Sequence, residues 1–267
     1  MSEHALEGAR TRPAEHAGPE RWLGTAWRQF RIERKMFWRN PSAAFFNFLL
    51  PLLLLALFGA IFAGERAKLD VIVPGIAGMS VMSATFIALA YNVTLLRERG
   101  ILKRLRGTPL PTSAWLGGVA ANAVANTVLQ LALVILAGHF VFGVAWPSDW
   151  LALIVFVGLG VVCFAALGVA LAHAIPNFES APAYVNAVFI PMILIAGVFY
   201  DEKSAPQVLR DAAEVLPLKH LIDGMSGAMV HHEGLADHGV ALLVLALWAA
   251  VGLTLAIRGF SWEARRD

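Results

Sequence analysis

Apolar segments about as long as a membrane span recur along the chain, and shorter polar connections separate them. A helix needs roughly 20 mostly apolar residues to cross a bilayer, and six segments near that length contain no Asp, Glu, Lys or Arg. The predicted spans are residues 43–63, 72–95, 116–140, 151–174, 183–200 and 239–257. The pattern therefore predicts an all-α polytopic membrane protein whose six-span domain occupies residues 41–257.

Two segments precede the first span, and only the second of them has a helical pattern of apolar residues. Residues 1–19 mix Ala, Glu, His, Gly and Pro without periodicity, which predicts a disordered cytoplasmic tail. In residues 20–40, apolar residues recur every three or four positions and most basic residues lie on other faces, as in an interfacial amphipathic helix. Its characteristic residues are Trp27, Phe30, Arg31 and Arg34. An ordinary juxtamembrane anchor without a further role is the alternative interpretation.

The connection between the last two spans, residues 201–238, is too long to be a simple turn. We expect short helices near residues 207–215 and 220–229. Whether this outer loop re-enters the outer leaflet stays open from the sequence.

Composition and charge support the membrane interpretation. Hydrophobic residues make up 58% of the 267 positions and charged residues 15%, where a soluble domain has about 25% charged residues. These values exclude an ordinary soluble domain, a disordered chain and a disulfide framework. Lys and Arg concentrate before the first span, between the second and third, and after the sixth, whereas the last loop is acidic. The positive-inside rule then predicts that both termini, including residues 258–267, are cytoplasmic.

The strongest local pattern is the connection LRERGILKRLRGTPLP at residues 96–111. Gly100 is expected to break the helix that emerges from the second span, and the next residues place a short apolar stripe among basic ones. Gly107 and Pro109 are expected to end this short helix and turn the chain back toward the membrane. A basic surface helix without a partner is the alternative interpretation.

This connection resembles the signature that follows the second span of ABC transporter type-2 permeases, the membrane subunits of ATP-binding-cassette exporters. Further similarities are Pro51 in the first span, Pro74-Gly75 at the start of the second, Pro191 and Gly197 around the fifth, and LPLKH at residues 216–220. The resemblance covers most of the chain and is closest in look to the daunorubicin-resistance type. It implies a coupling helix that docks on a separate ATPase, with Glu98, Gly100, Leu102, Lys103, Arg104, Leu105, Arg106, Thr108 and Pro109 in that role.

Neutral polar residues inside the spans are the other candidates for function. The predicted spans contain no Asp, Glu, Lys or Arg, and His139 and His173 lie near span ends, so proton or sodium coupling is not favoured. Two sets of neutral residues remain, Ser80 and Ser83 in the second span and Asn122, Asn126 and Gln130 in the third. Two interpretations stay open: hydrogen bonding between helices, or the lining of a translocation path for an amphipathic substrate.

The resemblance implies a permease subunit of an ABC exporter for a hydrophobic or amphipathic substrate, such as a drug, an antibiotic or a lipid. Export of a lipid-linked polysaccharide or another cell-envelope glycan is the alternative, followed by a membrane scaffold or intramembrane enzyme without an ATPase. The implied partners are two copies of a cytoplasmic ABC ATPase, a second permease copy as homodimer or heterodimer, and membrane lipids, but no nucleic acid. ATP and Mg would bind the ATPase, so we expect no catalytic residue, cofactor or metal in this chain. Its expected location is the bacterial plasma membrane.

Overall fold

The computed structural model describes residues 19–101, 112–200 and 205–259, and all regular elements in these ranges are helical. The elements are α1 (Pro19–Arg39), α2 (Pro41–Ile61), α3 (Arg66–Met82), η2 (Ser83–Ile87), α4 (Ala88–Glu98), α6 (Thr112–Phe142), α7 (Trp150–Ala174), α8 (Ala181–Ile195), α9 (Gln207–Ala213), α10 (Pro217–Ser226), η4 (Gly227–His231), η5 (Leu235–His238) and α11 (Gly239–Gly259). The predicted tail before Pro19 and the segment after Gly259 lie outside the described residues.

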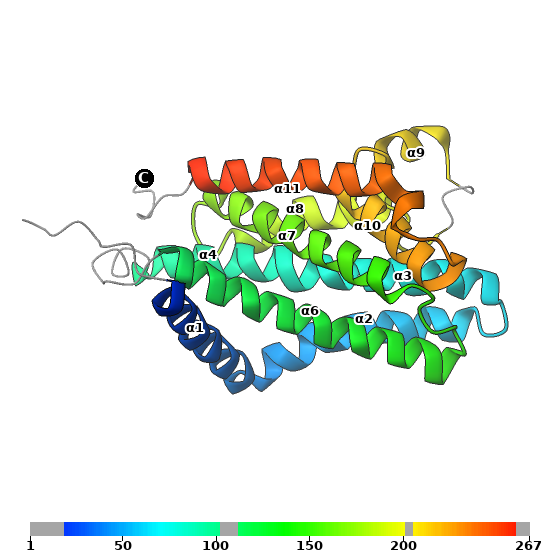
Figure 1. Ribbon diagram of the computed structural model, residues 1–267, viewed down its shortest axis with the longest axis horizontal. Helices are drawn as coiled ribbons and strands as arrows, with labels where there is room; N and C mark the ends of the chain where they lie inside the picture. Colours follow the sequence, from blue (N-terminus) through cyan, green and yellow to red (C-terminus); the bar gives the residue numbers. More distant parts are fainter. Residues whose placement is uncertain (1–18, 102–111, 201–204, 260–267) are drawn as a thin grey trace, which may run out of the picture.

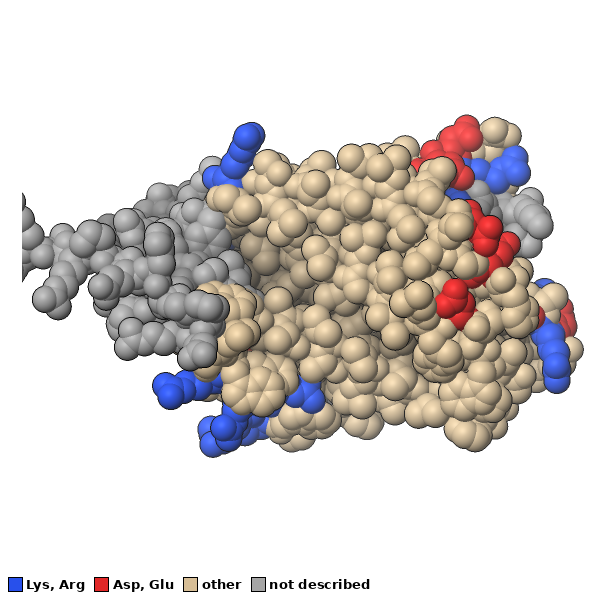
Figure 2. Space-filling model, in the orientation of Figure 1, with Lys and Arg blue, Asp and Glu red and all other residues tan. Residues whose placement is uncertain are grey.

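The long helices other than α1, which lies obliquely, run roughly along the longest axis of the molecule (Figure 1). At one end lie α1, the last turn of α4 and the end of α11, which together we call the basic end (Figure 1). At the opposite end lie α9 and α10, which we call the acidic end. On the face drawn in Figure 2, Asp and Glu gather at the acidic end, and the basic end shows Lys and Arg. The acidic end also carries Lys and Arg (Figure 2), but the gathering of Asp and Glu there is the charge asymmetry that the sequence predicts.

Helices occupy all six predicted span positions, and four of them are long and apolar enough to cross a membrane. These four are Arg66–Glu98, Gly117–Phe142, Trp150–Ala174 and Leu235–Gly259. The apolar helices at the first and fifth positions, Asn47–Ile61 and Ala181–Ile195, are shorter. The protein is therefore a multi-pass helical membrane protein, and a total of six crossings stays a prediction.

The fifth predicted span ends earlier than the sequence suggests. Helix α8 stops at Ile195, whose carbonyl oxygen accepts a hydrogen bond of 3.0 Å from the Tyr200 hydroxyl. Gly197 has a φ of +76°, which favours glycine and turns the chain. The carbonyl oxygen of Val198 then lies 2.2 Å from where a Cβ would stand on Gly75. This close contact between distant segments replaces the predicted last helical turn.

The outer loop is folded into the acidic end of the bundle. Helix α10 packs against α3, α7 and α11, and its residues Leu218, Leu221 and Met225 are completely buried. The buried Lys219 ammonium pairs with the carboxylates of Asp223 at 2.7 Å and Glu214 at 3.5 Å. The predicted short helices are therefore present, and the second of them forms part of the core.

A π-helical turn interrupts the second predicted span at the point where α7 crosses it. Residues Ser83–Ile87 form this turn between α3 and α4, and Gly168 of α7 lies against it. A Cβ on Gly168 would stand 2.5 Å from the carbonyl oxygen of Phe86. Only a glycine permits this approach without a shift of the backbone.

We expect Gly168→Ala to lower the midpoint of thermal unfolding in detergent, because overpacking typically costs about 1–3 kcal/mol. Gly158→Ala in the same helix is the matched control, since no atom lies within 4 Å of a Cβ there. Both changes improve helix propensity by up to about 1 kcal/mol, so the control is expected to be neutral or stabilising. The midpoints are measured by circular dichroism, and equal midpoints for the two variants would contradict this packing.

Candidate functional site

Helix α1 packs closely along the part of α6 that lies at the basic end. A Cβ on Gly117 would stand 3.2 Å from the Trp22 ring, and one on Gly118 would stand 2.5 Å from Cβ of Gln29. The small residues of α6 thus let α1 approach, as they do in membrane helix pairs. Away from α6, α1 exposes basic residues and, on either side of them, the apolar residues Leu23, Trp27, Ile32, Met36 and Trp38. A helix at this position was predicted, and its placement in the membrane interface stays a prediction.

A polar cluster joins α1 to α4 and α6. The Gln29 side-chain amide donates a hydrogen bond of 2.8 Å to the Glu33 carboxylate, which is only 5% exposed and also bonds to Asn92 of α4. The neighbouring Arg34 guanidinium donates to the Asn126 side-chain oxygen in α6. Three helices that are separated in the sequence therefore meet through their side chains.

The buried carboxyl in this cluster has a shifted pKa. Burial raises the pKa of Glu33 above the ordinary value of 4.5, because the charged form loses hydration. The hydrogen bonds from Gln29 and Asn92 favour the charged form and oppose the rise. The larger effect is burial, so the folded protein binds a proton here more tightly than the unfolded chain does.

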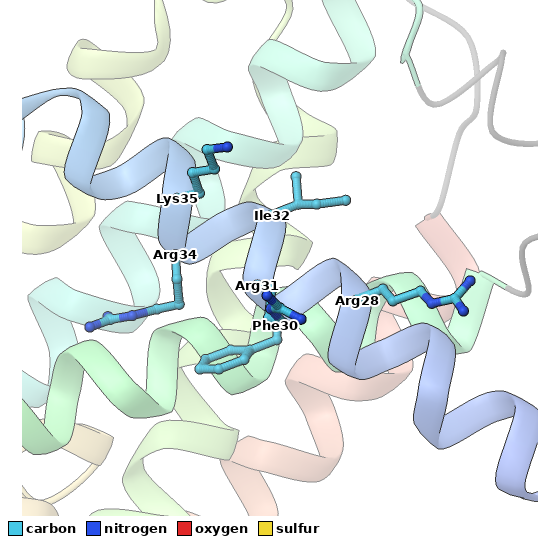
Figure 3. Close-up of a pocket in the computed structure, with 6 residues that line it drawn as sticks. All are labelled: Arg28, Phe30, Arg31, Ile32, Arg34 and Lys35. Carbon is cyan, nitrogen blue, oxygen red and sulfur yellow. The ribbon is translucent and has the colours of Figure 1, made fainter.

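Helix α1 also carries a groove of about 620 Å³ lined by Arg28, Phe30, Arg31, Ile32, Arg34 and Lys35. Lys35 and Ile32 project from one side of the helix, and Phe30 and Arg34 project from the other (Figure 3). Arg28, Arg31 and Lys35 are exposed. Phe30 stacks on Trp27 with 5.0 Å between the ring centroids. The exposed cations of this groove can bind anionic groups.

The last turn of α4 binds the segment that follows α7. Arg97 is only 6% exposed, and its guanidinium donates to the carbonyl oxygens of Ala172, at 2.9 Å, and Ile175. The Glu98 carboxylate accepts a hydrogen bond from the backbone N–H of Phe178. The chain is thus anchored to another helix immediately before the predicted coupling helix begins.

The start of the predicted coupling helix is described and the remainder is not. Gly100 has a φ of +64° and lies two residues after Glu98, the last residue of α4, so the predicted helix break is observed. The other residues that the resemblance assigns to ATPase docking lie outside the described residues: Leu102, Lys103, Arg104, Leu105, Arg106, Thr108 and Pro109. Their role stays a prediction.

The polar residues of the spans mostly bond within the protein. Ser80 and Ser83 donate to carbonyl oxygens of their own helix. The Gln130 amide donates to the carbonyl oxygen of Asn47 in α2 at 3.1 Å. Asn126 binds α1, as described above, and the Asn122 side-chain oxygen is buried without a hydrogen-bond partner among the described residues. Asn126 and Gln130 thus bond to other helices, and the path interpretation stays untested.

Sequence reasoning missed Glu33, Asn92 and Arg97 as members of the site. Glu33 could have been found, because it lies four positions after Gln29 and thus on the face of α1 that packs on α6. Arg97 was counted only as one of the basic residues beside the second span. Its carbonyl partners lie more than 70 positions later, and no sequence pattern marks them. Among the described residues, no group of three His, Cys, Asp or Glu could hold a metal ion.

Comparisons with known proteins agree with this architecture. The linearmycin resistance permease protein LnrN of Bacillus subtilis is 23% identical over 183 residues, 66% of this chain and 47% of that protein. Nodulation protein J of Sinorhizobium fredii is 27% identical over 175 residues, 64% of this chain and 65% of that protein. The probable multidrug ABC transporter permease YbhS of Escherichia coli is 21% identical over 194 residues, 72% of this chain and 50% of that protein. The chain spans between about half and just under two thirds of the length of these relatives.

Fold and site together define the class of multi-pass helical membrane proteins that carry a basic helix at one end of the bundle. A family model described as ABC-2 type transporter matches residues 25–230, which is most of the chain. The protein therefore belongs to the ABC-2 type transporter family. The resemblance drawn from residues 96–111 is confirmed at the level of the family.

The raised pKa of Glu33 leads to a testable pH dependence. Wild-type stability should fall as the pH rises from 4.5 through the higher folded-state pKa, because the folded state must then release a proton that it binds more tightly than the unfolded chain. Glu33→Gln keeps a hydrogen-bonding side chain of similar size and removes this titration. We expect the thermal midpoint of Glu33→Gln minus that of the wild type to increase with pH and then level off. A difference that stays flat or decreases would contradict the burial argument.

Proposed function

We propose that this chain is the membrane permease subunit of an ABC exporter, and that it forms the translocation path for a hydrophobic or amphipathic substrate. Two copies of a separate cytoplasmic ABC ATPase bind ATP and Mg and supply the energy. Two permease copies form the transporter in the bacterial plasma membrane. The basic end faces the cytoplasm, because clusters of Lys and Arg remain on that side of a membrane.

The observation that carries this proposal is the arrangement of the basic end. Residues 99–111 join the end of α4 to the start of α6, and they contain most of the motif on which the family resemblance rests. Helix α1 packs on α6 at the same end. An ATPase that docks there reaches both the connection and α1, which is what a soluble motor needs in order to act on membrane helices.

ATP binding acts on the permease by changing the relative stability of its conformations. A ligand shifts such an equilibrium only by its difference in affinity for the two states. In this proposal, the closed pair of ATPases binds the outward-facing arrangement of the connections more tightly than the inward-facing one. The contacts of Arg34 with α6 and of Arg97 with α7 then carry that preference into the spans.

The substrate class is supported by a groove between α6 and α7. It has a volume of about 520 Å³ and is lined mainly by Val, Leu and Ile, with Trp146 and Trp150 among the lining residues. Pockets for small molecules are usually about 300–1,000 Å³ and mostly apolar. The names of two relatives refer to linearmycin resistance and to multidrug transport, which favours a drug or antibiotic. The third is named for nodulation, a name that states no substrate, and export of a cell-envelope glycan stays the second candidate.

The proposal predicts that the apolar stripe of the connection binds the ATPase. Isolated helices shorter than about 12–15 residues are marginal in water, so this segment needs a docked surface for its order. Burial of Leu102 and Leu105 would contribute on the order of 1.5–3 kcal/mol each. We expect Leu102→Asp with Leu105→Asp to insert at normal levels and to lose the ATPase when the tagged chain is purified.

The control for this experiment is Val208→Asp in α9, which adds a carboxylate to a 77% exposed position at the acidic end. It should retain the ATPase fully. Membrane levels of the three proteins are matched before purification. Full recovery of the ATPase with the double variant would show that the connection is only a surface helix.

A further inference from the structure

We propose that Arg97 and Glu98 form a clamp that fixes the turn between α7 and α8, residues 175–180, to the start of the ATPase connection. Movement of the connection then reaches α8 directly as well as through α6. Both side chains are positioning residues that act within this chain. This inference rests on the proposed function for the source of the movement, but the contacts of the clamp do not depend on it. It also differs from the family motif, which implies ATPase docking for Glu98.

The Arg97 half of the clamp caps the end of α7. The last carbonyl groups of a helix lack partners within the helix, and basic side chains are well suited to bind them. Arg97 reaches across from α4 and binds two such groups, at Ala172 and Ile175. Burying a guanidinium is costly unless it is hydrogen-bonded. Arg97 therefore holds α7 at a fixed position relative to α4.

The Glu98 half of the clamp binds the turn itself. Its carboxylate accepts the Phe178 backbone N–H, and a hydrogen bond to a charged acceptor is stronger than one between neutral groups. The Phe178 ring also contacts Tyr91 of α4 edge to face, with 6.1 Å between the centroids. Backbone and ring of Phe178 are thus both held by α4.

A displacement of Phe178 is transmitted to α8, because the turn between them is short and hydrogen-bonded internally. The Asn177 side-chain oxygen accepts the Ser180 backbone N–H at 2.9 Å, and the Ser180 hydroxyl donates to the Asn177 carbonyl oxygen at 3.0 Å. Helix α8 begins at the next residue, Ala181. On the other side, Gly100 begins the connection two residues after Glu98. The clamp therefore lies between the ATPase connection and two membrane helices.

Hydrogen–deuterium exchange of the purified chain tests the contact without any ATPase. In Glu98→Ala, exchange of the Phe178 amide should accelerate about tenfold, as expected for the loss of a hydrogen bond to a charged group. Glu98→Gln keeps an acceptor oxygen without the charge, and its Phe178 exchange should fall between that of the wild type and that of Glu98→Ala. Arg99→Ala, which changes the adjacent exposed side chain, is the matched control and should have no effect. Unchanged exchange in Glu98→Ala would overturn the clamp.

The complex with the co-purifying ABC ATPase tests the role of the clamp. Adding a non-hydrolysable ATP analogue with Mg should change the exchange of α8 in the wild type and in Arg99→Ala. In Glu98→Ala the ATPase should remain bound at the wild-type level, while this nucleotide-dependent change in α8 is lost. Thermal midpoints of the variants are compared to show that all remain folded.

Two results in the complex would overturn the positioning role. If Glu98→Ala loses the ATPase, Glu98 docks on the partner as the motif implies. If the nucleotide-dependent change in α8 persists although Phe178 exchanges faster, the clamp is structural only. Absence of an ATPase from the wild-type preparation would count against the proposed function instead. Exchange of the Phe178 amide would still show whether Glu98 binds it.

Discussion

Charged groups at the edge of a membrane must be paired when they are buried, and the basic end of this protein is organised by that requirement. An unpaired buried charge costs several kcal/mol. Glu33 and Arg97 are buried, Arg34 is half-buried, and each is hydrogen-bonded. Arg34 and Arg97 find their partners on other helices, and Glu33 also bonds to Asn92 of α4. Pairing these charges therefore connects α1, α4, α6 and α7.

The acidic end is held together in a different way. There the buried Lys219 pairs with Asp223 and Glu214, both within five residues in the sequence. The core of that end is the apolar face of α10 against α3, α7 and α11. Long-range polar contacts occur there too, but between neutral groups: the Ser148 hydroxyl donates to the Ala228 carbonyl oxygen, and the Trp248 indole N–H donates to that of Val215.

Most helices of the fold could be predicted from the sequence because length and apolar character decide them locally. The end of α8 could not, because it depends on the contact of Val198 with Gly75 in a distant helix. The π-helical turn near Phe86 could not either, since it pairs with Gly168 of α7. The family could be inferred from the connection at residues 96–111. The partners of Arg97 could not, because they are backbone carbonyls that any residue type provides.

Because α1 packs closely on Gly117 and Gly118 of α6 and Arg34 binds Asn126, the proposed function implies that α1 and α6 move as one body when the ATPase acts on the basic end. A Cβ on Gly117 would stand 3.8 Å from Cβ of Ala26, which is the usual spacing across a disulfide. Ala26→Cys with Gly117→Cys in a Cys163→Ala background should therefore cross-link α1 to α6. The most direct measurement is the ATP hydrolysis rate of the complex in its oxidised and reduced forms. We predict equal rates, and a loss of hydrolysis on oxidation that a reductant restores would show that α1 moves against α6.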